Sequence, residues 1–201
     1  VLEFTGVQFL TFNVDNARSQ GAELELFGRF DSNISMNLAL TYADAEYGDD
    51  CDKGLAASPA IATIRRLCGQ VLTNAPKFTG VAGVTYDGPL TDSGWGLLAS
   101  FNTNYSSKRR TGTVPLDLLS NGTTPPFPFD FQEGYIKMNA RLGFRTPDER
   151  FTIEGWVNNI SDEVTRGITA NTPLRGPAGA RSRIGFIVEP RTYGVTVRAK
   201  F

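Results

Sequence analysis

Histidine is absent from this chain of 201 residues. Its absence excludes Ser-His-Asp and Cys-His catalysis, and every histidine-ligated metal site, from this segment. An excess of one charge is also lacking, because the formal net charge is −1, whereas nucleic-acid-binding proteins usually carry a basic excess. We therefore expect a protein that is not an enzyme, with no nucleic-acid partner, no cofactor and no metal site.

Long hydrophobic runs are missing as well. No stretch of about 18 apolar residues occurs, which excludes a transmembrane helix in this chain. That criterion does not detect membrane barrels, whose strands are short and only half apolar. Both a soluble and a barrel protein therefore remain open on this evidence.

Cysteine is scarce, with Cys51 and Cys68 as the only two, both in one polar stretch. An even number inside one loop predicts a disulfide formed in an oxidising compartment. Two free thiols in a cytosolic protein are the alternative. Asp49, Asp50 and Asp52 surround Cys51, but they lack the EF-hand spacing and do not predict a calcium site.

Alternation of apolar and polar residues runs through most of the chain. The segment ISMNLALTYADAEY (34–47) places Ile, Met, Leu and Tyr on one face and Ser, Asn, Ala and Thr on the other. WGLLASFNTNY (95–105) and YIKMNARLGF (135–144) repeat this arrangement. A period of two predicts β-strands with one apolar face. No stretch has a convincing helical period, so the predicted fold class is all-β and antiparallel.

Short and long connections alternate between these segments. The short ones are 31–33, 89–94 and 147–149, and the long ones are 48–74, 108–130 and 164–181. In an up-and-down sheet alternate connections share one end, so the long loops should all lie together. Short turns at one end and long loops at the other are typical of outer-membrane barrels, in which apolar stripes face lipid. Tyrosine and tryptophan near the segment ends match aromatic girdles.

The turn at 147–149 makes a register prediction. If Pro147 and Asp148 form a two-residue turn, Arg141 lies opposite Glu154 on the polar face, where the opposite charges would be mildly stabilising. The same register places Phe144 opposite Phe151 on the apolar face.

The last strand pattern runs to the end of the chain. Pro190 cannot donate to a sheet ladder, and the alternation changes phase there, which predicts a bulge at 189–192 and a membrane-crossing strand at 191–201. The terminal aromatic resembles the signal that the barrel-assembly machinery reads in bacterial outer-membrane barrels. The residues in this signal are Tyr193, Val195, Val197 and Phe201.

Five segments in order resemble one family, the TonB-dependent receptors. They are NARSQGAELEL (16–26), LTYADAEY (40–47), GQVLTNAPKFTGVAGVTY (69–86), the stretch 135–163 and PRTYGVTVRAKF (190–201). The resemblance implies that residues 1–201 are the C-terminal third, about seven to eight strands, of a transmembrane barrel of about 22 strands. Part of one strand is expected at residues 1–5. The plug domain is expected outside this chain, which opens inside a strand pattern and reads as a fragment.

The resemblance also implies a function. It is active import of a scarce ligand, such as a ferric siderophore, cobalamin or an oligosaccharide, across the Gram-negative outer membrane. The implied partners are outer-membrane lipid and lipopolysaccharide, the plug domain, the TonB complex, the barrel-assembly machinery and the small-molecule ligand. A soluble, disulfide-stapled all-β binding or adhesion domain is the main alternative. An outer-membrane lipid hydrolase would need the missing histidine, and a porin-type barrel is a further alternative.

Candidate ligand contacts lie in the loops and on the polar face. They are Lys108, Arg109, Arg110, Phe127, Phe129, Trp156 and Arg175. The basic residues suit an anionic ligand or lipopolysaccharide phosphates, although a solvated charged rim would look the same. The two phenylalanines would touch the ligand or pack on neighbouring loops. The tryptophan would stack on a sugar or catecholate, or pack against the plug.

Overall fold

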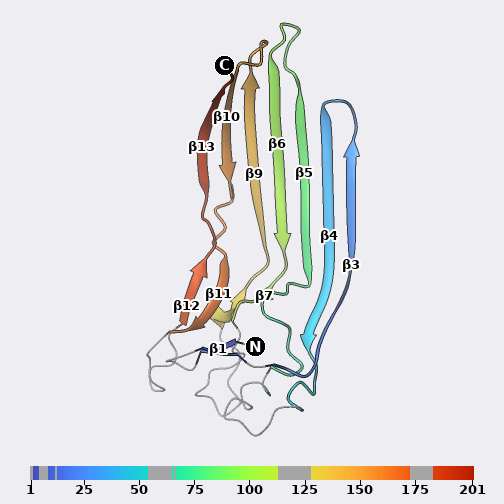
Figure 1. The fold of residues 1–201 in the computed structure, drawn as a ribbon, viewed down its shortest axis with the longest axis vertical. Helices are drawn as coiled ribbons and strands as arrows, with labels where there is room; N and C mark the ends of the chain where they lie inside the picture. Colours follow the sequence, from blue (N-terminus) through green and yellow to red (C-terminus); the bar gives the residue numbers. More distant parts are fainter. Residues whose placement is uncertain are drawn as a thin grey trace.

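The main feature of the computed structural model is a seven-stranded antiparallel sheet (Figure 1). The structure describes residues 2–4, 9–11, 13–53, 65, 67–112, 128–172 and 183–201. In these ranges, no helix is long and apolar enough to cross a membrane. The seven-stranded sheet confirms the all-β antiparallel fold class, and it is open, with two edge strands.

The seven strands follow one another up and down. Along the sheet they are β13 (Thr192–Ala199), β10 (Phe151–Asn158), β9 (Tyr135–Arg145), β6 (Gly96–Ser106), β5 (Phe78–Pro89), β4 (Ile34–Tyr47) and β3 (Ala17–Arg29). Each strand pairs with the strand before it in this order, as the alternation of short and long connections predicts. β3 and β13 form the two edges of the sheet.

Three small two-stranded sheets lie outside the main one. They pair β1 (Leu2–Phe4) with β2 (Phe9–Thr11), β7 (Arg109–Arg110) with β8 (Phe131–Gln132), and β11 (Arg166–Asn171) with β12 (Arg183–Ile187). A short 3-10 turn, η1 (Pro128–Asp130), precedes β8. The prediction that residues 1–5 add a strand to the barrel sheet is wrong, because β1 pairs with β2 instead.

Cross-strand register places an apolar stripe from each of the seven strands on one face, although Phe27, opposite Asn37, lies on the other. Leu38, for example, pairs with Leu26 of β3 and Ala82 of β5. This face stays uncovered: Leu142 is 50% exposed and Val197 is 67% exposed. Among the described residues the buried hydrophobic side chains are Cys51 and Leu67, which lie in a loop. The stripe is thus not the core of a soluble sandwich.

The opposite face is polar. Asn37, Asn102 and Asn139 line up across neighbouring strands, with Gly83 between the first two. Glu154 and Arg141 lie on the same face. At the loop end of the apolar face, the rings of Tyr42 and Phe78 stand 5.1 Å apart. An amphipathic tyrosine ring at the edge of an apolar band is typical of membrane interfaces.

The turn between β9 and β10 is longer than predicted. The amide of Thr146 donates to the carbonyl of Phe151 at 2.9 Å, which closes a four-residue loop. Within it Glu149 takes a left-handed backbone (φ 56°), and the Asp148 carboxylate accepts from the amide of Arg150 at 3.1 Å. The Asp148 carboxylate satisfies a backbone amide within the loop, which stabilises this four-residue loop in place of the predicted two-residue turn.

The register therefore differs from the prediction by two residues. Arg141 lies opposite Trp156, and Phe144 lies opposite Ile153 rather than Phe151. A shift of two preserves the side-chain face. The Arg141 Nη1 atom still reaches the Glu154 Oε1 atom, diagonally, at 3.3 Å.

Two further predictions concern the loops. The disulfide Cys51–Cys68 is confirmed, with the amide of Asp15 donating to the Cys51 carbonyl at 3.2 Å. The predicted bulge at 189–192 is instead a break between two strands that pair with different partners, β12 with β11 and β13 with β10. Pro190 lies in that break.

The terminal strand is fitted to its neighbour by a tryptophan and a glycine. The indole of Trp156 covers Gly194, where an added Cβ would lie 2.6 Å from the ring carbon Cζ2. The Trp156 Nε1 atom donates to the hydroxyl of Thr196 at 3.3 Å. A side chain at position 194 would displace the indole and break this bond.

We expect Gly194→Ala to destabilise the full-length protein by about 1–3 kcal/mol, because overpacking forces the ring away. Urea unfolding in detergent micelles measures this. The control is Gly155→Ala in β10, where an added Cβ meets nothing closer than 4.0 Å. Equal losses for both variants would contradict the Trp156–Gly194 fit.

Candidate functional site

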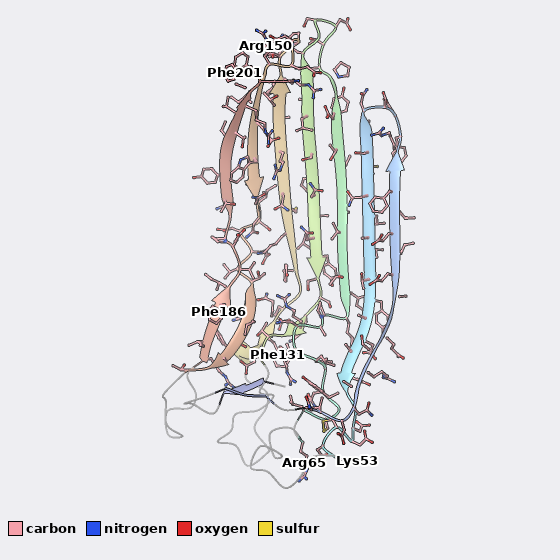
Figure 2. All side chains as sticks on the ribbon, in the orientation of Figure 1. Lys53, Arg65, Phe131, Arg150, Phe186 and Phe201 are labelled. Atoms are coloured by element: carbon pink, nitrogen blue, oxygen red, sulfur yellow. A yellow bond between two sulfur atoms is a disulfide. The ribbon has the colours of Figure 1, made fainter. Side chains whose placement is uncertain are left out.

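The long loops converge at one end of the sheet. β7, β8, β11 and β12 all lie at the end opposite the short turns (Figure 1). Figure 2 places Lys53 and Arg65 at this end, and Arg150 and Phe201 at the short-turn end. The arrangement agrees with the expectation that all the long loops lie together.

Asp130 is the hub of a buried polar cluster that joins two of these loops. Its Oδ2 atom lies 3.0 Å from the Arg183 Nη2 atom, and both side chains are 5% exposed. Its Oδ1 atom accepts from the Thr169 hydroxyl at 2.9 Å, which also lies 3.0 Å from the Thr111 hydroxyl. Burial raises the pKa of the Asp130 carboxyl, whereas Arg183 and the Thr169 hydrogen bond act in the opposite direction.

Backbone hydrogen bonds extend the cluster to the disulfide loop. The amide of Thr111 donates to the Asp130 carbonyl at 2.7 Å, and the amide of Thr169 donates to the Thr111 carbonyl at 3.0 Å. From the third loop, the amide of Asn74 donates to the Arg110 carbonyl at 2.8 Å. The three long loops are thus fastened together rather than independent.

The basic run at 108–110 is not one surface patch. Lys108 extends outward to Glu133, with 2.6 Å between Nζ and Oε1. Arg109 donates to the Tyr135 hydroxyl at 3.2 Å and to the Arg166 carbonyl at 3.1 Å. Arg110 is only 2% exposed, and burial lowers the pKa of its guanidinium. Lys108 therefore lies at the surface, whereas Arg109 is half-buried with its guanidinium bonded within the loops, and Arg110 belongs to the interior of the loop cluster.

Aromatic rings cover the guanidinium groups in this region. The Phe129 ring centre lies 4.9 Å from the Arg166 Cζ atom, and its edge packs on Gly185. Phe131, labelled in Figure 2, has Lys108 Nζ 5.5 Å from its centre; its role is not apparent from the sequence. Phe127 and Arg175 lie outside the described residues.

The polar face of the sheet carries a second group of candidates. Trp156 lies there, flat on Gly194, as the sequence alternation indicates. Beside it Glu154 is 3% exposed and holds Arg141, which is half exposed. Arg145 and Asp87 form a further pair at 3.2 Å, nearer the short turns. The polar face of the sheet therefore carries two ion pairs and the indole of Trp156.

Two of the three aspartates around Cys51, Asp50 and Asp52, form ion pairs. Asp50 lies 2.8 Å from the Lys53 Nζ atom, and Asp52 lies 2.7 Å from the Arg65 Nε atom. Within the ranges that the structure describes, no group of three or more potential metal ligands occurs.

Sequence reasoning missed the central members of the loop cluster, Thr111, Asp130 and Thr169. No local signal marks them, because the contacts that unite them link positions 39 and 58 residues apart. A lone aspartate in a loop usually faces solvent. Only the folded loops bring its carboxylate beside buried arginines.

Solved structures that resemble the described fold include three receptors. The ferric yersiniabactin uptake receptor FyuA from Yersinia pestis has a TM-score of 0.68 and 18% identity, covering 92% of this chain and 24% of that one. BauA, the ferric preacinetobactin receptor from Acinetobacter baumannii, has a TM-score of 0.59 and 17% identity, covering 94% of this chain and 23% of that one. The ferric-catecholate import receptor Fiu from E. coli K12 has a TM-score of 0.59 and 19% identity, covering 100% of this chain and 23% of that one.

This chain thus spans about a quarter of the length of those receptors, at 23% to 24%. A search of the curated proteins finds no significant match. A family model described as "TonB dependent receptor-like, beta-barrel" matches residues 2–160. Because that match covers more than half of the 201 residues, the chain belongs to the TonB-dependent receptor-like β-barrel family.

Proposed function

We propose that this chain is the C-terminal barrel part of a Gram-negative outer-membrane receptor that imports a scarce ligand with energy delivered through TonB. The observation that supports this most is the uncovered apolar face of a continuous seven-stranded sheet. Such a face is stable against hydrocarbon and is a liability in water. It also disfavours the soluble binding domain considered from the sequence.

The sheet has a natural position in a bilayer. Tyr42 and Phe78 end the apolar face toward the long loops. Immediately beyond them, Asp44 pairs with Lys77 at 2.8 Å and with Arg18 at 3.6 Å. Charges beyond an aromatic boundary suit the headgroup layer, where outer-membrane lipid and lipopolysaccharide are the expected neighbours. The polar face then lines the lumen that the plug domain would fill.

The edges of the sheet agree with a role inside a larger barrel. β3 has all of its residues exposed, and β13 is the opposite edge. Unpaired edges are avoided in membranes by closing the barrel, so further strands must pair with both. The terminal pattern Tyr193 to Phe201 would serve as the signal for the barrel-assembly machinery that closes it.

The ligand class is best supported as an iron chelate. The three receptors compared above are each named for a ferric chelate, and this chain carries an exposed Lys108 and a half-buried Arg109 on its loops. Cationic side chains attract the anionic groups that many chelators carry. Phe129 and Trp156 offer further aromatic contacts; cobalamin and oligosaccharides remain the alternatives.

We expect deletion of the full-length gene to abolish uptake of one ferric chelate, measured with radioactive iron in a panel of chelates, cobalamin and glycans. The Lys108→Ala, Arg109→Ala double variant should weaken uptake about tenfold, because two charge-assisted contacts are lost. Arg150→Ala, at the opposite end of the sheet, is the matched control. Unchanged uptake of the whole panel after deletion would refute the import function.

A second prediction concerns the loop cluster that would frame the ligand. Thr169→Val keeps the shape of the side chain but leaves the Asp130 carboxylate and the Thr111 hydroxyl with one fewer partner. We expect the opening free energy of β11–β12 to fall by about 1–3 kcal/mol, measured by hydrogen exchange of the full-length receptor. Thr85→Val in β5 is the control. Unaltered exchange in Thr169→Val would mean that the cluster does not fasten the loops.

A further inference from the structure

The guanidinium of Arg110 is a buried charge that makes no hydrogen bond among the described residues. The residue is 2% exposed, and its Nε and Nη1 atoms are both buried and unpartnered. Its position is fixed by the backbone, since its carbonyl accepts from the amide of Asn74 and its strand pairs with β8. Buried charges in proteins are normally paired, so this one calls for an acceptor.

The carboxylate of Asp130 does not supply that acceptor, because Arg110 Nε and Nη1 make no hydrogen bond to it. One of its oxygens is bonded by Thr169 and the other by Arg183. Asp130 interacts with Arg110 only through space.

Three arginines surround the carboxylate of Asp130. Arg110, Arg166 and Arg183 all act on Asp130, the one carboxylate in the described cluster. The Arg166 Nη2 atom donates to the Phe131 carbonyl at 2.9 Å, while its Nε atom is buried without a hydrogen-bond partner. The Nε atom of Arg166, like the Nε and Nη1 atoms of Arg110, is therefore without a hydrogen-bond acceptor.

The aromatic rings restrict where a counter-ion can bind. The Phe131 ring centre lies 5.8 Å from the Arg110 Cζ atom, and Phe129 lies against Arg166. Rings pack against guanidinium faces, so an acceptor must approach the N–H edges in the plane of the group. Planar edges of this kind match carboxylate and phosphate oxygens.

We propose that Arg110, assisted by Arg166, binds an oxyanion group, a carboxylate or a phosphate, inside the cluster that fastens the three long loops. The anion is either free in solution or a carboxylate of a larger ligand. It would complete the hydrogen bonding of Arg110 and strengthen the contact between β7 and the neighbouring loops. This site does not depend on which compound the receptor imports.

The test is hydrogen exchange of the purified full-length receptor, monitored over β7–β8 and β11–β12. Inorganic phosphate, acetate and citrate are each added to a buffer without oxyanions. We expect at least one of them to slow exchange about tenfold. Arg110→Met should abolish that response, and Arg150→Met in the short turn should keep it.

The outcomes separate the two sources of the anion. Protection by phosphate or acetate supports a free anion, and protection by citrate alone supports carboxylates of a larger ligand. Protection by none of the three overturns the proposal, as does an equal response in Arg110→Met. High protection without added anion that Arg110→Met removes would assign the counter-ion to the protein itself and also overturn it.

Arg110→Lys is the second variant, for the case that Arg110→Met does not fold. It keeps the positive charge but loses the planar guanidinium edge. We expect its response to be intermediate. If neither variant folds, the wild-type response to the three anions decides. Loss of import in the uptake assay would leave this readout unaffected, so the two proposals fail separately.

Discussion

Continuous antiparallel register is the constraint on which the rest of this structure depends. With a side-chain period of two, a slip of one residue in any strand would move its apolar residues to the polar face. The register keeps Leu26, Leu38 and Ala82 on one face, and it does the same across the remaining strands. A membrane-facing band and a polar lumen then follow from the same hydrogen-bonded ladder, and the position of the loops follows from its up-and-down order.

The loop end uses a different kind of stabilisation. Hydrocarbon cannot cover these segments, and their described hydrophobic core is confined to Cys51 and Leu67. A disulfide and a buried ion-pair cluster around Asp130 hold them instead. Polar clusters of this type fix geometry because every member needs its partner. Loops held as a unit can present ligand-binding groups at fixed positions, whereas independent loops would lose more conformational entropy on binding.

The alternation of residues sufficed to predict the sheet, its order and its two faces, because these depend on local period and loop length. It did not suffice for the turn after β9, where Glu149 adopts a positive φ that a non-glycine residue seldom takes. Nor could it locate Asp130 beside Arg183, since contacts between distant loops leave no periodic trace. Trp156 was assigned to the polar face by parity, but its fit over Gly194 required the observed register.

The terminal strand shows how one short segment satisfies two environments. Tyr193, Val195 and Val197 alternate on the outward face, where the membrane and the assembly machinery would meet them. Gly194 lies between the first two and faces inward, where the absence of a side chain admits the indole of Trp156. Because neighbouring residues point to opposite faces, neither requirement restricts the other. A fit on the lumen side can therefore set the register in which the outward pattern is displayed.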